Sequence, residues 1–350
     1  MSDVERIFSN KNWDEYVEVL TRHNVLSDIY FDSGFLDADA NLQNGEYEIY
    51  FLENEQKYFI YPYIKVPFTF GNRTLFDLIS PYGYAGPISN DRFFFNYAEK
   101  KFIEYTRKDE NIVTEFVRYH YLYGERQKFS VEINNEKNRD IVTLNLQNPW
   151  DSLFKNDFSP TARNLVRKME NQGFNFEIDD KFQNIDDFIA LYYGNMKHAS
   201  AADFYYFPKD FFYKLKDNLP GKMILAHIKK DNEIYCSSLF FLHSGIVTYY
   251  LSGRDIQFSQ IPSNYLILSS MVKWSEENGF KLFNFGGGRS TQVDDNLLKF
   301  KQHFSKNTTP YFTGKRVHNI ALINEIREDF ISRKGIEEFQ RKRHLLQFYR

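Results

Sequence analysis

The chain has 350 residues, enough for two domains that each bury a full hydrophobic core. A hydrophobic content of 42% with 26% charged residues excludes an extended disordered protein. The formal net charge of -3 excludes a broadly basic surface. We therefore expect no DNA partner, and any polyanion would have to bind a local patch such as Arg341-Lys-Arg-His344.

The single cysteine, Cys236, excludes an internal disulfide framework and a cysteine-based zinc site. It lies in a segment that reads as a strand, where we expect a small buried side chain. The eight histidines form no ligand-spaced cluster with carboxylates, so no metal is expected. No Gly-x-Ser-x-Gly motif is present, which leaves covalent catalysis without support.

The first residues, Met1-Ser-Asp-Val-Glu-Arg-Ile-Phe8, contain no apolar signal region, and no window approaches a membrane span in length. We expect a cytoplasmic protein without a membrane span. Aromatic residues are abundant, at 18% of the chain. We favour a bias in nucleotide composition as the reason, although Tyr-rich clefts also suit sugars and other flat polar ligands.

The first half of the chain predicts two strands, a turn-rich loop, a helix and a further strand. These segments are 46–52, 58–66, Ile79-Ser-Pro-Tyr-Gly-Tyr-Ala-Gly-Pro87, 91–107 and 112–120. The second half predicts strands over 223–228, 235–242 and 246–251, a loop over 252–255, a helix over 264–278 and a strand over 281–285. Meander, loop, helix and strand recur in the same order, which indicates an internal repeat.

Between the halves lies a helix with clear end signals: Ser159 suits the N-cap, Pro160 the first turn and Gly173 the C-terminal stop. Arg163 and Arg167 stack one turn apart beside its apolar stripe.

Two arginines at this spacing could grip a phosphate or a carboxylate. The alternative, which the spacing alone favours, is a solvated face on which Arg167 pairs with Glu170.

The segment Lys281-Leu-Phe-Asn-Phe-Gly-Gly-Gly-Arg-Ser290 runs from an alternating strand into three glycines. Gly286, Gly287 and Gly288 relieve steric limits on the backbone, so that successive N–H groups can converge on an oxyanion or a phosphate. A simple loop is the alternative.

A helix over 297–304 follows, with Lys301 inside its apolar stripe of Leu297, Phe300 and Phe304. A lysine there must reach solvent along its stem, find a partner or take part in chemistry.

Three parts of the chain together resemble the Fem-like branch of the GNAT superfamily, which includes aminoacyltransferases that build peptidoglycan cross-bridges and acetyltransferase-like proteins of polysaccharide pathways. They are Thr143–Gly173, the segment from Leu191-Tyr-Tyr to Tyr205-Tyr-Phe-Pro-Lys-Asp-Phe-Phe212, and Asn284-Phe-Gly-Gly-Gly with Phe300, Lys301 and Phe304. Ser80–Pro87 is similar to the corresponding loop of the first family domain. The resemblance covers about residues 25–315.

The resemblance implies an α/β fold with mixed sheets, built from two tandem GNAT-like domains over 1–150 and 151–316, followed by a helical segment over 317–350. It also implies acyl transfer to an amine, with Lys301 as the catalytic residue near the reaction centre. The implied substrate-binding residues are Arg163, Arg167, Tyr205, Tyr82, Gly286, Gly287, Gly288 and Arg289.

One departure concerns the donor. A standard GNAT domain has an Arg/Gln-x-x-Gly-x-Gly/Ala loop for the pyrophosphate of coenzyme A, whereas this chain has Arg254-Asp-Ile-Gln-Phe-Ser-Gln-Ile-Pro-Ser263. We expect no tightly bound cofactor and a donor that is either an aminoacyl-tRNA or an acyl-CoA, with a lean towards the aminoacyl type. The expected acceptor is an amine-bearing sugar nucleotide or peptidoglycan precursor. The alternative is a non-catalytic scaffold protein of an envelope polysaccharide pathway that retains the double fold.

Overall fold

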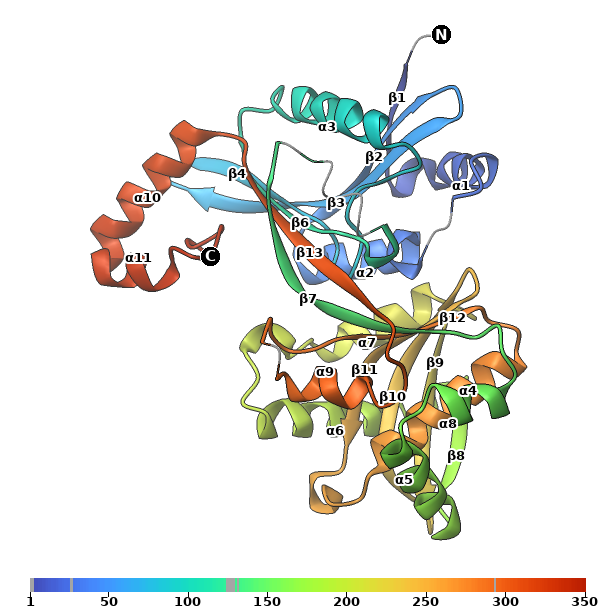
Figure 1. Cartoon of the computed structure of the whole chain (residues 1–350). Helices are drawn as coiled ribbons and strands as arrows, with labels where there is room; N and C mark the ends of the chain where they lie inside the picture. The colour runs from blue at the N-terminus through green and yellow to red at the C-terminus, as the bar shows by residue number, and fades with distance from the viewer. Residues whose placement is uncertain (1–2, 26–27, 124–129, 131, 293) are drawn as a thin grey trace. The chain divides into compact units, whose positions relative to one another are not determined.

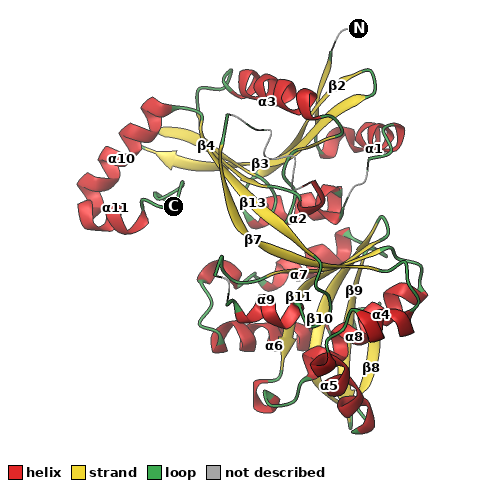
Figure 2. Cartoon of the chain, viewed as in Figure 1, coloured by secondary structure: helices red, strands yellow, loops and turns green. Residues whose placement is uncertain are grey.

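The computed structural model describes the chain except for residues 1–2, 26–27, 124–129, 131 and 293. The described residues form two compact units. Unit 1 contains residues 1–25, 30–138 and 311–350, and unit 2 contains residues 26–29 and 139–310. Each unit combines a mixed sheet with helices (Figure 2), which confirms the expected α/β class.

The sheet of unit 2 has the strand order β8-β9-β10-β11-β12-β7. Its strands are β8 (Asn175–Asp179), β9 (Met223–Lys230), β10 (Glu233–His243), β11 (Ile246–Arg254), β12 (Leu282–Gly287) and the second half of β7 (Asn134–Asn145). All neighbours are antiparallel except β11 and β12, which are parallel because helix α8 (Ser263–Glu277) connects them.

Helices α6 (Ile185–His198) and α8 cover opposite faces of this sheet. In the register of β10 and β11, Cys236 lies opposite Arg254, and Ser237 lies opposite Gly253. Neighbouring residues of a strand point to opposite faces. The Cys236 thiol contacts α8, whereas a side chain at Gly253 would point into α6. The remaining helices of unit 2 are α4 (Trp150–Asn156), α5 (Pro160–Asn171), α7 (Lys209–Asn218) and α9 (Asn296–Lys301).

Helix α5 begins and ends as its sequence predicts. The Ser159 hydroxyl accepts a hydrogen bond from the Ala162 N–H (3.2 Å), Pro160 is the first helical residue, and Gly173 follows the end with a φ of 79°. The buried residues Val166 and Met169 join it to the core of unit 2.

The sheet of unit 1 repeats this plan in the order β1-β2-β3-β4-β6-β13. Its elements are β1 (Val4–Phe8), α1 (Trp13–Arg22), α2 (Ser33–Leu42), β2 (Glu46–Asn54), β3 (Lys57–Phe70), β4 (Arg73–Ile79), α3 (Arg92–Thr106), β6 (Ile112–Arg118) and part of β13 (Thr308–Val317), with the short β5 (Ile88–Ser89) paired to β3. Strands β4 and β6 are parallel, as β11 and β12 are. The internal repeat is therefore present, and it is longer than the predicted segments.

Strand β4 is absent from the sequence-based prediction because it carries a charge in its buried half. Asp77 is fully buried, and its carboxylate accepts hydrogen bonds from the Thr114 hydroxyl (2.6 Å), the Tyr349 hydroxyl (2.8 Å) and the Arg350 Nε (2.8 Å). Partners from distant parts of the chain thus offset the cost of burying this carboxylate.

The two halves of the chain exchange their last strands. β7 follows unit 1 in sequence, yet its residues 141–145 pair with β12. β13 follows unit 2, yet Thr313–Val317 pair with β6, beside which it lies in Figure 1. Because of this exchange, unit 2 begins its main segment at residue 139, and the chain returns to unit 1 at residue 311. These boundaries differ from the expected domain ranges 1–150 and 151–316.

The C-terminal helices, expected as a separate segment over 317–350, belong to unit 1. α10 (Ile320–Lys334) and α11 (Ile336–Lys342) follow β13, and α10 contributes Leu322, Ile326 and Phe330 to an apolar cluster with Leu75 of β4 and Val113 of β6. In the described part of the chain, no helix combines the length and apolarity needed to cross a bilayer.

Gly253→Ala should destabilise unit 2 by about 2–4 kcal/mol, since the added Cβ would lie 2.4 Å from the Tyr192 nitrogen and 2.5 Å from the Leu191 carbonyl carbon. Those atoms are the backbone of α6 and cannot move aside alone. Urea unfolding measures the change. Gly194→Ala, inside α6 with no atom within 4 Å of its Cβ, is the control and should be neutral or stabilising. Equal effects of the two changes would contradict this packing.

Candidate active site

The two parallel strands of unit 2 pair over only three residues each before they separate. Ile246–Thr248 of β11 pair with Leu282–Asn284 of β12. Beyond that point Gly286 and Gly287 pair with β7, while β11 continues to Arg254 along β10. The loop predicted over 252–255 is therefore wrong up to Arg254, because pairing with β10 extends the strand. The separation leaves Tyr249 as the first residue of β11 without a partner on β12.

Lys301 lies at this point of separation. Its Nζ donates a hydrogen bond to the Gly287 carbonyl (2.8 Å) and lies 5.7 Å from the centre of the Tyr249 ring. Only 7% of the residue is exposed, so its ammonium does not reach solvent along the stem. Phe304, three residues further on, stacks on Phe285 of β12 and fixes α9 against the strand.

Helix α9 ends at Lys301, earlier than the predicted range 297–304. His303 in the following turn holds this end in place. Its Nδ1 hydrogen-bonds the Ser159 hydroxyl (2.7 Å), and its carbonyl accepts from the Ser159 N–H (2.8 Å). The N-cap of α5 and the end of α9 thus fix each other.

The surroundings of Lys301 favour its neutral form. Burial and then the nearby Arg139 guanidinium lower its pKa to about 7, against the opposing effect of the Asp295 carboxylate. At neutral pH the amine therefore exists in both protonation states, which is typical of groups that take part in catalysis.

The backbone N–H groups after the glycine run do converge on an anion, and that anion is the chain's own Asp295. Its carboxylate accepts from the N–H groups of Arg289, Ser290 and Leu298, each at 2.8 Å. Burial would raise the pKa of Asp295, yet these hydrogen bonds hold it below its usual value. Asp295 thus takes up the N–H groups that a bound anion would need.

The glycines allow close approach of side chains from other elements. A Cβ at Gly287 would lie 2.6 Å from the Arg139 Cδ, and one at Gly288 would lie 2.7 Å from an Asp295 oxygen. Gly286 has a φ of 75°, and its N–H donates to the Asn284 side chain (2.8 Å). Gly286 and Gly287 still belong to β12, so the strand runs further than predicted.

Sequence reasoning missed Arg139. It lies on β7, and its Nη1 donates to the Gly288 carbonyl (2.7 Å). The motif around Gly286–Gly288 carries no signal for it, because the contact depends on the strand exchange that pairs β7 with β12.

A polar row continues from Tyr249 towards α8. The Ser238 hydroxyl donates to the Ser252 hydroxyl (2.9 Å), and the Cys236 thiol donates to the Asn264 side chain (3.1 Å). Burial raises the pKa of Cys236 to about 11, so its thiolate is scarce at neutral pH. Among the described residues, no three His, Cys, Asp or Glu side chains gather as metal ligands would.

The two arginines of α5 make separate contacts. The Arg163 Nη1 donates to the carbonyls of Phe158 and Lys155, the second at 2.9 Å, and so closes the end of α4. Arg167 is exposed and lies over the Phe154 ring at 5.5 Å. Within the described residues it forms no ion pair with Glu170. A role of either arginine in binding an acceptor stays a prediction.

The two predicted tyrosines belong to different units. Tyr205 is 37% exposed, and its carbonyl accepts from the Tyr192 hydroxyl (2.6 Å) in unit 2. Tyr82 belongs to unit 1, where its N–H donates to the buried Asp39 (2.8 Å) and its ring lies 5.9 Å from the Arg118 guanidinium.

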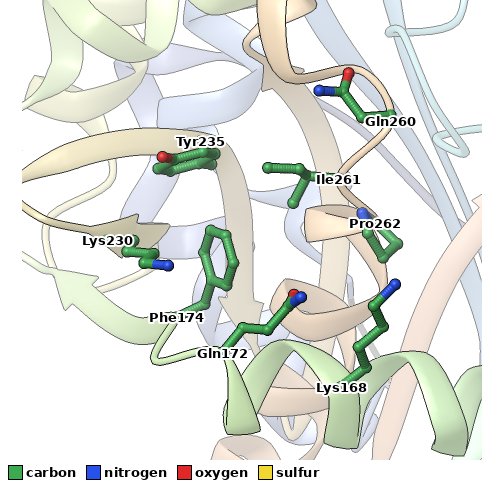
Figure 3. Close-up of a pocket in the computed structure, with 8 residues that line it drawn as sticks. All are labelled: Lys168, Gln172, Phe174, Lys230, Tyr235, Gln260, Ile261 and Pro262. Atoms are coloured by element: carbon green, nitrogen blue, oxygen red, sulfur yellow. The ribbon is translucent and has the colours of Figure 1, made fainter.

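Unit 2 also carries an open pocket of about 450 Å³ between α5, the turn from β9 to β10, and the connection from β11 to α8. Figure 3 shows its lining, which contains no carboxylate: Lys168, Gln172, Phe174, Lys230, Tyr235, Gln260, Ile261 and Pro262. The Lys230 ammonium lies 5.2 Å from the Phe174 ring. Neither Lys301 nor the glycine run lines this pocket, so the pocket is separate from the site where β11 and β12 separate.

A known protein family and known structures are similar to this chain. The profile of the acetyltransferase (GNAT) domain family matches residues 157–301, all within unit 2, and the match ends at Lys301. Unit 2 therefore carries a domain of the GNAT acetyltransferase type. The search of curated proteins gave no match.

Three solved structures show that the GNAT fold extends over the chain. FemX is 12% identical with a TM-score of 0.68, covering 93% of this chain and 100% of its own. L-PGS from Bacillus licheniformis is 13% identical with a TM-score of 0.52 over 88% and 94%. The C-terminal domain of a putative lysylphosphatidylglycerol synthetase from Agrobacterium fabrum is 14% identical with a TM-score of 0.50 over 92% and 98%. The predicted resemblance to the Fem-like branch is confirmed at the level of the fold.

Lys301→Met should stabilise the folded chain most at low pH. The folded-state pKa of about 7 lies below the unfolded value, so burial of the charged lysine costs free energy at and below pH 7. That cost fades as pH rises towards about 10.4. We expect a gain on the order of 2–4 kcal/mol at pH 6.5 that shrinks by pH 9.5, measured by urea unfolding. A gain that does not depend on pH would show that Lys301 does not titrate in this window.

Proposed function

We propose that this GNAT protein is an N-acyltransferase that transfers an aminoacyl or acetyl group from an activated donor to the amine of a cell-envelope, peptidoglycan or polysaccharide precursor. The observation that carries the proposal is the buried Lys301 ammonium on the Gly287 carbonyl, where β11 and β12 separate. The similarity of the fold to FemX and to two lysylphosphatidylglycerol synthetase-type structures supports a reaction on activated acyl groups.

The proposed acyl transfer passes through an oxyanion whose negative charge must be stabilised. The neutral acceptor amine attacks the acyl carbon of an ester or thioester, and the carbonyl electrons move to the oxygen. Lys301, in its ammonium form, stabilises this oxyanion. When the oxyanion collapses, the C–O or C–S bond breaks, the amine nitrogen loses a proton, and the leaving alcohol or thiol takes one up. The low dielectric around the buried lysine strengthens the interaction.

The connection from β11 to α8 favours an aminoacyl donor over coenzyme A. The Asp255 carboxylate occupies the Gln257 N–H (2.8 Å), so a negative charge lies where a pyrophosphate would need N–H donors. Pro262, the residue before α8, has no N–H to offer. An aminoacyl-tRNA donor would not need these backbone N–H groups, because its phosphates could bind basic residues elsewhere on the surface.

The acceptor in this proposal is an amine-bearing sugar nucleotide or peptidoglycan precursor. The alternative of a non-catalytic scaffold gains no support from Lys301. Burial of its ammonium costs free energy, so an apolar side chain would serve the fold better at this position.

Lys301→Met should lower kcat by about 10²–10³ while the chain stays folded, because the oxyanion loses its charged partner. The assay follows label transfer from aminoacyl-tRNA pools and from acetyl-CoA to amino-sugar nucleotides and peptidoglycan precursors. Lys299→Met, an exposed lysine on the same helix, is the matched control and should retain activity. Full activity of the Lys301 variant would remove Lys301 from the reaction.

Calorimetry with acetyl-CoA tests the donor. Because Asp255 and Pro262 leave the α8 connection without an anion cradle, we expect weak or no binding. Low-micromolar affinity would reverse the donor assignment and make the chain an acetyltransferase of amino sugars.

A further inference from the structure

Arg139 and Lys301 hold neighbouring carbonyls of the same turn. The Arg139 Nη1 donates to the Gly288 carbonyl (2.7 Å), and the Lys301 Nζ donates to the Gly287 carbonyl (2.8 Å). The first comes from β7 and the second from the end of α9, 162 positions apart in the sequence. Two basic side chains thus donate to consecutive backbone carbonyls inside unit 2.

The arginine stem also fills the space above the turn. A Cβ at Gly287 would lie 2.6 Å from the Arg139 Cδ and 3.0 Å from its Cγ. The side chain is therefore packed on the glycine as well as hydrogen-bonded to the next carbonyl. Both contacts of Arg139 are therefore with the turn whose Gly287 carbonyl receives Lys301.

The charged and titratable groups around Lys301 are few. Arg139 on β7 opposes its protonation, and Asp295 before α9 favours it. Tyr249 on β11 faces it with a ring whose hydroxyl stays protonated, since burial raises its pKa. The Asp295 charge is largely engaged with its own loop, where it accepts from three backbone N–H groups and the Ser290 hydroxyl. Arg139 is therefore the group whose removal changes the field at Lys301 most directly.

We propose that Arg139 is a positioning residue for Lys301: it fixes the Gly287–Gly288 turn whose carbonyl holds the lysine side chain. The role in acyl transfer rests on the proposed function. The coupling between the two side chains does not, because it is a property of the folded chain.

A double-mutant cycle in stability tests the coupling without any substrate. The four chains are the wild type, Arg139→Gln, Lys301→Met and the double variant, unfolded in urea from pH 6 to pH 10. The stability difference between chains with and without the Lys301→Met substitution reports the titration of Lys301. With the uncharged Gln at position 139, the midpoint of that titration should rise by about one pH unit. Lys299→Gln removes an exposed charge from α9 and should leave the midpoint in place.

An unchanged midpoint in the Arg139→Gln background would overturn the proposal. An equal rise with Lys299→Gln would do the same, because it would make the effect one of general charge.

Acyl transfer supplies the second readout. Arg139→Gln should shift the pH at which activity is lost upwards together with the stability midpoint. Arg139→Lys keeps the charge but not the planar fork, so it should leave the midpoint low and reduce kcat, with KM less affected. Wild-type kcat in Arg139→Lys would overturn the positioning role. If the stability cycle shows coupling while no donor is consumed by the wild type, the proposed function fails and the Arg139 coupling stands.

Discussion

The structure of unit 2 depends on how one buried ammonium is accommodated. An isolated lysine charge in an apolar interior is costly, and proteins meet that cost with hydrogen bonds, opposite charges or loss of the proton. Lys301 uses all three: a carbonyl of β12 accepts from its Nζ, Asp295 lies close by, and its pKa falls to about 7. The site exists because β11 and β12 separate and expose a backbone carbonyl to α9.

The glycine run Gly286–Gly288 supports the Lys301 site, although such runs usually indicate backbone N–H groups that bind an external anion. The Asn284 side chain accepts from the Gly286 N–H, and Asp295 accepts from the N–H groups of Arg289 and Ser290. The glycine turn between them is thus a preorganised support for two cations. Without side chains at Gly287 and Gly288, Arg139 and Asp295 can lie against the backbone. Preorganisation of this kind is what electrostatic catalysis requires, because the dipoles need not reorient as the oxyanion forms.

Much of this was predictable from local sequence. The end signals of α5, the meander of β9 to β11 and the position of Lys301 in an apolar stripe follow from periodicity and capping residues. β4 was not predictable, because Asp77 breaks its pattern and is compensated by Tyr349 and Arg350 far along the chain. Arg139 was equally hidden, since only the exchange of β7 and β13 brings it to the glycine turn. Local rules fail where long-range partners decide the outcome.

The role of Lys301 depends on a change of its protonation state near neutral pH. Lysine side-chain NMR, following the Cε and Nζ resonances from pH 5 to pH 11, measures this directly, with the Lys301 signal assigned by its absence from a Lys301→Met sample. We expect the Lys301 signal to change near pH 7. A Lys301 signal that changes only near the ordinary lysine pKa of about 10.4 would contradict this.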